Sequence, residues 1–289
     1  MMPGIVARIA QFQEAGQIPG MNKFAAIATC LVCAVSAPDF ASASSSDWFE
    51  TDGGRVRLVT TGKPSADGRL TGILDIDLKP GWKTYWRDPG DAGVPPQIGI
   101  AASTNVTGAE LGFPAPQRHD DGYAKWAGYD YPVALPVMFT LKSPDGPAII
   151  DAEIFLGVCQ TICIPVKTRL ILDPARDPDN PEDAAAVARA LAALPTPATP
   201  DLGVTVADAA RKMLVLEASL PEGASAANLF LAGAQGYAFG APVKSVEDGK
   251  TLFSIEVLAP PAAAPAGPGL HYTLVADAAS VSGVLPYPK

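Results

Sequence analysis

The run Ile73-Leu74-Asp75-Ile76-Asp77-Leu78 decides the fold class of this chain. Its residues alternate between apolar and acidic side chains, which is the period of a β-strand with one face in a core and the other in water. Asp75 and Asp77 are therefore expected on the water side. The run Arg55-Val56-Arg57-Leu58-Val59 alternates in the same way, and both runs predict half-buried strands.

More strand-like runs follow, and turn signals separate them. The turns are marked by Lys79-Pro80-Gly81, Asp88-Pro89-Gly90 and Pro144-Asp145-Gly146, because proline and glycine favour chain reversal. Short strands punctuated in this way predict an antiparallel β-sandwich and not an α/β sheet. The further strands expected in this half are Tyr131–Leu141, Ala148–Phe155 and Thr168–Leu172.

The composition changes after the first half of the chain. Residues 173–181 are rich in proline and aspartate, and Glu182–Leu191 consists mainly of helix formers with acidic residues in the first turn. The sequence thus predicts an all-β chain of two sandwiches, joined by a Pro-rich linker and a short helix. The strands expected in the second sandwich are Met213–Ala218, Asn228–Leu231, Thr251–Val257 and Leu270–Val275.

A secretory signal is predicted near the N-terminus. Met21-Asn22-Lys23 is a short basic segment, Phe24–Ala37 is apolar, and Ala41-Ser42-Ala43 fits a small-x-small cleavage site. The apolar segment is too short to span a bilayer comfortably, which takes roughly 20 residues. Because Cys30 and Cys33 fall in this leader, we expect a soluble, exported protein that keeps two cysteines in a compartment where disulfides persist.

The charge of the chain argues against nucleic-acid partners. Acidic residues outnumber basic ones, the formal net charge is −9, and removal of residues 1–43 leaves that charge unchanged. Nucleic acids and anionic membranes attract clusters of Lys and Arg, and the sequence has no such cluster. We exclude both classes of partner.

Histidine-based chemistry has little support in the sequence. The chain contains two histidines, His119 and His271, one in each half. A His-based metal centre needs several converging ligands, and a hydrolase triad needs a histidine beside an activated nucleophile. The sequence also has no Gly-x-Ser-x-Gly elbow and no phosphate-binding glycine loop. We interpret both histidines as surface or interface residues.

The remaining chemistry belongs to Cys159 and Cys163, in the run Gly157-Val158-Cys159-Gln160-Thr161-Ile162-Cys163-Ile164-Pro165. Four residues of extended strand span about 13 Å, whereas a disulfide tolerates a Cα separation of roughly 4.4–6.8 Å. If the two cysteines pair, the residues between them must fold back as a turn or a single helical turn. Gly157 and Pro165 would help the chain to enter and leave such a loop.

Spacing alone leaves three uses open for this pair. Closing so short a loop contributes roughly 2 kcal/mol in the chain-entropy model, so a structural staple gains little. Tight disulfides are often the more reducible ones, which favours redox exchange. Two thiolates can also hold Cu(I), although Met and His are scarce nearby. A cation that stabilises a thiolate could come from Lys167 or, through the fold, from Arg87 or Arg118.

Three ordered motifs surround and include the pair. They are Gly81-Trp82-Lys83-Thr84-Tyr85-Trp86-Arg87-Asp88-Pro89-Gly90-Asp91-Ala92-Gly93, then Phe113-Pro114-Ala115-Pro116-Gln117-Arg118 followed by Gly128-Tyr129, and finally the run Cys159–Pro165. In order and spacing they resemble the periplasmic N-terminal domain of the DsbD thiol:disulfide interchange family, and most of all its ScsB-type branch, linked to copper tolerance. The motifs cover Trp48–Leu172, and the second half looks similar to the extra β domain of that branch.

The resemblance implies immunoglobulin-like sandwiches and a two-cysteine active site. Electrons would pass from a membrane-embedded thiol reductant to periplasmic thioredoxin-like acceptor proteins. Carried over to this sequence, Cys159 and Cys163 would be the redox pair, and Tyr85 and Trp86 would be aromatic support near them. The stretch from Arg118 to Tyr123 would be the loop that shields the disulfide. No cofactor is needed, because both electrons reside in the sulfur pair.

Two features depart from the family pattern. We expect the chain to lack the family's membrane domain and its terminal thioredoxin-like domain, so electrons would come from a separate protein. The Cys-x-x-x-Cys spacing is also tighter than in the best-known DsbD members.

We therefore predict a periplasmic thiol:disulfide oxidoreductase of the protein-disulfide reductase type, with Cys163 as the cysteine that joins partners. Two alternative functions are also consistent with the sequence. One is a Cu(I)-binding copper-tolerance protein with Cys159 and Cys163 as ligands, and the other is a structural adaptor with an inert disulfide. The predicted segments are an upstream extension and signal peptide (1–43), a redox domain (44–175), a linker with the short helix (176–200) and a second sandwich (201–289).

Overall fold

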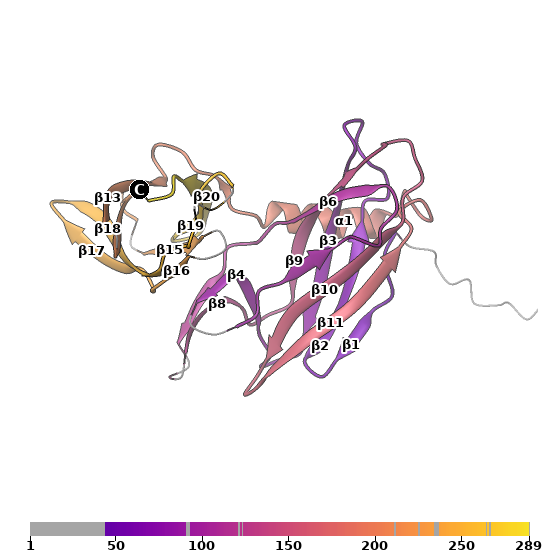
Figure 1. Ribbon diagram of the computed structural model, residues 1–289, viewed down its shortest axis with the longest axis horizontal. Coiled ribbons are helices and arrows are strands. Elements are labelled where there is room, and N and C mark those ends of the chain that lie inside the picture. The colour runs from indigo at the N-terminus through magenta and orange to yellow at the C-terminus, as the bar shows by residue number, and fades with distance from the viewer. Residues whose placement is uncertain are drawn as a thin grey trace, which may run out of the picture. The chain divides into compact units, whose positions relative to one another are not determined.

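The computed structural model describes residues 44–90, 93–120, 122, 124–210, 212–224, 226–233, 237–263, 265 and 267–288 (Figure 1). Residues 41–289 form one compact unit. In the described part of the chain the regular structure is almost entirely β, with a single α-helix, and its hydrophobic residues gather mainly in two cores. The all-β, two-sandwich prediction is confirmed. The predicted leader, with Cys30 and Cys33, lies outside the described residues.

The first sandwich contains three antiparallel sheets. A five-stranded sheet in the order β1-β2-β3-β9-β6 shares its core with a three-stranded sheet ordered β11-β10-β5, and a small third sheet is ordered β4-β8-β7. The strands are β1 (Phe49–Thr51), β2 (Gly54–Thr60), β3 (Arg69–Leu78), β4 (Thr84–Gly90), β5 (Gln97–Gly99), β6 (Val106–Leu111), β7 (Gln117–Asp120), β8 (Lys125–Tyr129), β9 (Val133–Leu141), β10 (Ile150–Cys159) and β11 (Cys163–Leu172).

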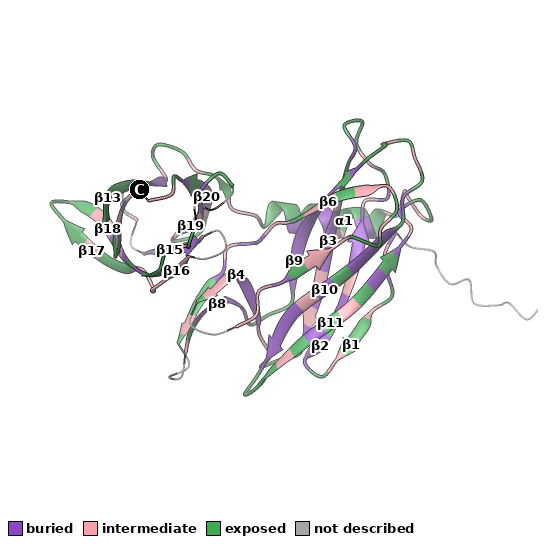
Figure 2. Ribbon diagram, viewed as in Figure 1, coloured by how far each residue is buried: buried purple, intermediate pink, exposed green. Residues whose placement is uncertain are grey.

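The alternation in the sequence predicts correctly which face of β3 is buried. Leu74 and Ile76 are fully buried in the core, and Figure 2 shows buried residues along β2, β3, β9 and β10. Asp75 and Asp77 lie on the opposite, partly exposed face, as a period of two requires. Burial of the apolar face is the main force that holds this sheet in the sandwich.

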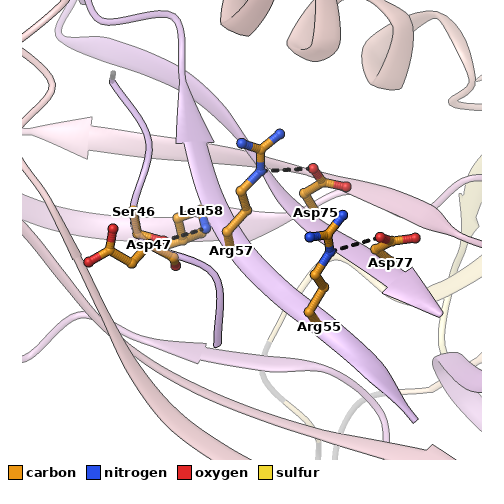
Figure 3. Close-up of polar contacts among 7 residues, drawn as sticks. All are labelled: Ser46, Asp47, Arg55, Arg57, Leu58, Asp75 and Asp77. Atoms are coloured by element: carbon orange, nitrogen blue, oxygen red, sulfur yellow. Dashed lines mark hydrogen bonds and ion pairs between the residues drawn. The ribbon is translucent and has the colours of Figure 1, made fainter. Parts of the chain in front are cut away.

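The partly exposed face of the same sheet is organised by cross-strand ion pairs (Figure 3). Arg55 Nε lies 2.9 Å from Asp77 Oδ2, and Arg57 Nε lies 3.1 Å from Asp75 Oδ2. Both guanidinium groups lie 4.4 Å from the ring centroid of Trp48. Such exposed pairs contribute little to stability, so we assign them no functional role.

The predicted helix forms as α1 (Pro181–Ala192) and packs on the first sandwich. The Asn180 side chain caps it by accepting hydrogen bonds from backbone N–H groups of the first turn. Val187 and Ala190 of the helix pack in a small cluster with Val59 and Ile73 of the five-stranded sheet. The residues predicted as a linker therefore include a segment that covers one face of this sheet.

The second sandwich has its own core and two sheets. One sheet is ordered β12-β20-β19-β15 and the other β13-β14-β18-β16, with β17 also paired to β18. In the first of them β12, which falls within the predicted linker, pairs in parallel with β20. The strands are β12 (Thr196–Pro197), β13 (Gly203–Ala210), β14 (Met213–Ser219), β15 (Ala227–Ala232), β16 (Ala238–Phe239), β17 (Val243–Glu247), β18 (Lys250–Ala259), β19 (Leu270–Ala276) and β20 (Ala279–Leu285).

Candidate functional site

Cys159 and Cys163 close the tip of the hairpin formed by β10 and β11, two strands that lie side by side in Figure 1. Cys159 ends one strand, Cys163 begins the next, and the backbone N–H of Gln160 donates to the carbonyl of Ile162 at 3.1 Å. The Cα atoms of Cys159 and Cys163 are 4.1 Å apart and the sulfurs form a disulfide. The predicted fold-back between the cysteines is thus confirmed as a three-residue hairpin loop.

Backbone pairing with a third strand segment explains why the two cysteines come so close. The N–H and C=O of Cys159 exchange hydrogen bonds with the backbone of Lys83, at 2.9 and 2.8 Å. Its pairing with Cys163 is then of the non-hydrogen-bonded kind, in which facing Cα atoms lie about 4.5 Å apart. Strand register therefore brings the two side chains within bonding distance.

The two cysteines differ sharply in exposure. Cys159, which we call the inner cysteine, is 1% exposed, whereas Cys163, the outer cysteine, is exposed. The loop between them is also open to solvent, with Ile162 70% exposed. A partner that approaches the hairpin tip thus meets the outer cysteine first.

Tyr85 of β4 connects the two sulfurs to the interior. Its hydroxyl donates a hydrogen bond to Sγ of Cys159 at 3.0 Å and lies 3.2 Å from Sγ of Cys163, while the residue itself is 2% exposed. Two glycines make room for the ring. A Cβ on Gly93 would lie 2.6 Å from Tyr85 Cδ1, and one on Gly157 would lie 3.2 Å from Cε2. The site is therefore shaped around this tyrosine.

An aromatic cluster supports Tyr85 from the neighbouring strands. Trp126 of β8 meets its ring edge-on with centroids 5.8 Å apart, and His119 of β7 stacks on Trp126 at 3.9 Å. Lys83 Nζ lies 4.5 Å from the Trp126 ring, which brings a cation into the same cluster. Trp126 and Lys83 were not among the residues predicted from sequence. One signal was available for Lys83, because it precedes Tyr85 by two residues and so shares its side of the chain.

The surroundings of His119 disfavour its protonated form. Burial lowers the pKa of His119 below its ordinary 6.5, Asp130 opposes that shift, and Lys83 adds to it. Its Nε2 is buried and has no hydrogen-bond partner among the residues that the structure describes. The interpretation of His119 as a surface or interface residue holds only in part, since the ring forms one wall of the cluster.

The lowered pKa of His119 predicts a pH dependence of stability. Between the lowered pKa and 6.5 the unfolded chain binds more protons than the folded one, so stability falls as pH drops through this window. We expect His119→Gln to lose less stability than wild type between pH 7.5 and 5.5. One proton limits the difference in slope to about 1.4 kcal/mol per pH unit. Urea unfolding at several pH values measures it, and parallel curves for the two proteins would contradict the assignment.

The other residues predicted to support the site lie away from this aromatic cluster or outside the described residues. Trp86 is buried, with its ring 5.9 Å from Phe230 of the second sandwich. Nη2 of Arg118 donates to the carbonyl of Leu229 at 2.9 Å. Tyr123 lies outside the described residues, so the predicted shielding loop from Arg118 to Tyr123 is only partly seen.

The cations proposed for thiolate stabilisation are also placed by the structure. Arg87 lies with its guanidinium 4.8 Å from the Phe113 ring, and burial lowers its pKa. Lys167 lies on β11 and is exposed. Lys83, which the sequence did not suggest for this role, pairs through its backbone directly with the inner cysteine.

Two features are absent from the described residues. No three His, Cys, Asp or Glu side chains in this part of the chain gather into a group that could hold a metal ion. Within the same residues, no helix is both long and apolar enough to cross a membrane.

The first and third motifs found in the sequence meet at the disulfide, and the second pairs with the first, because Gly128 faces Tyr85 across β4 and β8. The first supplies Lys83 and Tyr85, and the third supplies the hairpin tip. The second is held together by Tyr129, whose buried hydroxyl donates to the carbonyl of Pro114 at 2.8 Å. The residues that carried the resemblance are thus neighbours in space.

The family match and the ScsB domain agree with the resemblance. Residues 56–175 match the family described as thiol:disulfide interchange protein DsbD, N-terminal. The N-terminal periplasmic domain of ScsB from Proteus mirabilis is 25% identical, with a TM-score of 0.68 over 86% of this chain and 100% of that chain. The reduced DsbD N-terminal domain from Neisseria meningitidis is 14% identical, with a TM-score of 0.25 over 41% of this chain and 83% of that one. No curated protein matches the chain by sequence.

Proposed function

We propose that this chain, which carries a DsbD-type N-terminal domain similar to that of ScsB, passes electrons in the periplasm through the Cys159–Cys163 pair. Its donor would be a membrane-embedded thiol reductant, and its acceptors would be periplasmic thioredoxin-like proteins. One observation carries the proposal: an exposed outer cysteine is bonded to a buried inner cysteine that Tyr85 supports. The periplasmic location is supported by the ScsB domain, which is described as periplasmic.

Reduction would begin at the outer cysteine. A thiolate of the donor attacks Sγ of Cys163, the Cys159–Cys163 bond breaks, and its electron pair leaves on Sγ of Cys159. The Tyr85 hydroxyl, 3.0 Å from that sulfur, donates a hydrogen bond to the developing thiolate. The donor's second thiolate then attacks the donor sulfur of the mixed disulfide, which releases Cys163. The donor ends as a disulfide, and the reduced pair takes up protons from water.

Electron delivery to an acceptor would reverse these steps. The Cys163 thiolate attacks the acceptor's disulfide and forms a mixed disulfide, because the outer sulfur is the accessible one. The Cys159 thiolate then attacks Sγ of Cys163, re-forms the internal disulfide and releases the acceptor as a dithiol. Two electrons leave the protein, and the acceptor takes up two protons.

Trapping of the mixed disulfide tests the proposed partners. Cys159→Ala removes the resolving sulfur and leaves Cys163 exposed, so the variant should accumulate in thiol-sensitive adducts in the periplasm of the cell that makes it. The matched control is Cys159→Ala/Cys163→Ala. The proposal predicts adducts with a thioredoxin-like protein or a membrane thiol protein, released by dithiothreitol and absent from the control. Absence of adducts from Cys159→Ala, or adducts in the control as well, would count against it.

A further inference from the structure

Opposite faces of the β4-β8-β7 sheet carry different contacts. On one face Tyr85 reaches the two sulfurs, and Trp126 packs against Tyr85. Side chains alternate between the two faces of a strand, so the next residues along, Trp86 and Ala127, point to the other face. Both are buried in the main core of the first sandwich. The other face must therefore be covered by something apolar.

Phe230 of β15, a strand of the second sandwich, packs on the face that carries Trp86 and Ala127. The residue is 2% exposed, and its ring meets Trp86 edge-on with centroids 5.9 Å apart. Arg118 of β7 lies over the same ring at 4.8 Å, and its Nη2 donates to the carbonyl of Leu229 at 2.9 Å. One aromatic ring and one backbone carbonyl of β15 thus contact the sheet that carries Tyr85.

Strand β15 is shared between the two cores. Leu229 and Leu231 pack in the core of the second sandwich, whereas Phe230 and Ala232 pack in the core of the first. This is the alternation expected of a strand that is apolar on both faces. Displacing the second sandwich would therefore unpack Phe230 from Trp86.

We propose that the second sandwich is a brace for the redox site, with Phe230 as a positioning residue that acts through Trp86 on Tyr85. The inference rests on the proposed function, because the position of Tyr85 matters only if the cysteines form thiolates. Tyr85 and Trp86 are consecutive on β4, so a shift of one moves the other. Hydrogen bonds weaken steeply with distance and angle. A loosened β4 would thus leave the Cys159 thiolate less stabilised.

The test compares Phe230→Ala with Leu229→Ala in the otherwise intact, reduced protein. The pH dependence of the ultraviolet absorbance of the thiolate, which does not require access to the sulfur, gives the pKa of the more acidic thiol. We expect Phe230→Ala to raise that pKa by about 0.3–1 unit, which lowers the thiolate fraction roughly two- to tenfold. Leu229→Ala loosens the second core and keeps the Phe230 contact, so its thiol pKa should match wild type.

Two further variants distinguish loss of the Phe230 contact from a general loss of stability. Arg118→Gln removes the bond to the Leu229 carbonyl without opening a buried cavity, and should raise the thiol pKa in the same direction. In a Tyr85→Phe background, Phe230→Ala should add no further shift, because the hydroxyl it positions is gone. Circular dichroism establishes that each variant is folded.

The brace is overturned if the thiol pKa is unchanged in both Phe230→Ala and Arg118→Gln. It is also overturned if Leu229→Ala shifts the thiol pKa as much as Phe230→Ala does. Additive pKa shifts from Phe230→Ala and Tyr85→Phe in the double variant would overturn it as well. These readouts need no partner protein. Failure of the proposed function would look different, with no trapped adducts but the pKa shifts intact.

Discussion

Cys159→Ala is expected to react rapidly with glutathione disulfide, and Cys163→Ala to react at least an order of magnitude more slowly. The first variant keeps the exposed outer cysteine, whereas the second keeps a sulfur that is 1% exposed. Access and thiolate character together set the rate of thiol–disulfide exchange. Mass spectrometry of the glutathione adduct over time measures both rates.

The two cysteine variants control for each other, because each removes the disulfide and changes one sulfur to the same methyl group. Loss of so short a cross-link should cost both proteins roughly 2 kcal/mol, and urea unfolding of each variant measures the further cost of removing the buried Cys159 sulfur. Equal rates, or faster adduct formation on Cys159, would reverse the assignment of outer and inner roles.

Tyr85→Phe is expected to slow exchange and to raise the pKa of the inner thiol. The variant removes one hydroxyl, which donates to Cys159 Sγ at 3.0 Å, and keeps the ring that packs on Trp126. A hydrogen bond to a charged acceptor contributes about 1.5–3 kcal/mol, so we expect a loss of roughly tenfold or more in the rate of disulfide reduction. Stopped-flow reduction by dithiothreitol measures the rate, and the pH dependence of the ultraviolet absorbance of the thiolate measures the pKa of the buried inner thiol.

Tyr129→Phe is the matched control for this prediction. Tyr129 is also a buried tyrosine whose hydroxyl has a defined acceptor, the carbonyl of Pro114 at 2.8 Å. Its loss should lower stability by about 1 kcal/mol and leave the thiol chemistry unchanged. If both variants slow exchange alike, the effect belongs to general loosening and Tyr85 has no special role.

The sequence predicts the sandwich strands well where one face is buried. Runs such as Ile73–Leu78 and Thr251–Val257 fall within β3 and β18, because the pleat imposes a period of two on any strand between core and water. The fold-back at Cys159–Cys163 was predictable for a different reason. Chain reach alone excludes an extended connection between bonded cysteines.

The small β4-β8-β7 sheet was the part that sequence reasoning missed. Asp88-Pro89-Gly90 predicts a turn, yet these residues belong to β4. Turn chemistry is present there, since the pairing of β4 with β8 shifts between Tyr85 and Gly90, and Gly90 N–H donates to Asp88 Oδ1 at 3.2 Å. A run such as Asp88-Pro89-Gly90 can therefore mark either a chain reversal or an irregularity within a strand, and the local sequence does not distinguish the two.

The sequence predicts β11 too short, because a proline lies near its beginning. The expected strand begins at Thr168, whereas β11 begins at Cys163 and includes Pro165. Proline is tolerated there because β11 is at the edge of its sheet, where one side of the strand needs no backbone donor. Edge position depends on the order of strands, which the sequence does not state.

The contacts among side chains of the site depend on register between distant segments. Trp126 reaches Tyr85 because Gly128 faces Tyr85 across the sheet, and His119 faces Trp126 on the next strand. No local pattern in the sequence contains these pairings. The sequence itself points to the cysteines, the resemblance supplies Tyr85, and the fold adds Trp126, His119 and Lys83.

The most direct measurement of the exchange function is the redox potential of the Cys159–Cys163 pair in glutathione buffers, followed by thiol labelling. An exchange protein should hold comparable amounts of dithiol and disulfide at a potential above about −300 mV, where cellular thiols can reduce it. A pair that remains fully oxidised below roughly −300 mV would behave as a structural bond and would contradict the exchange function.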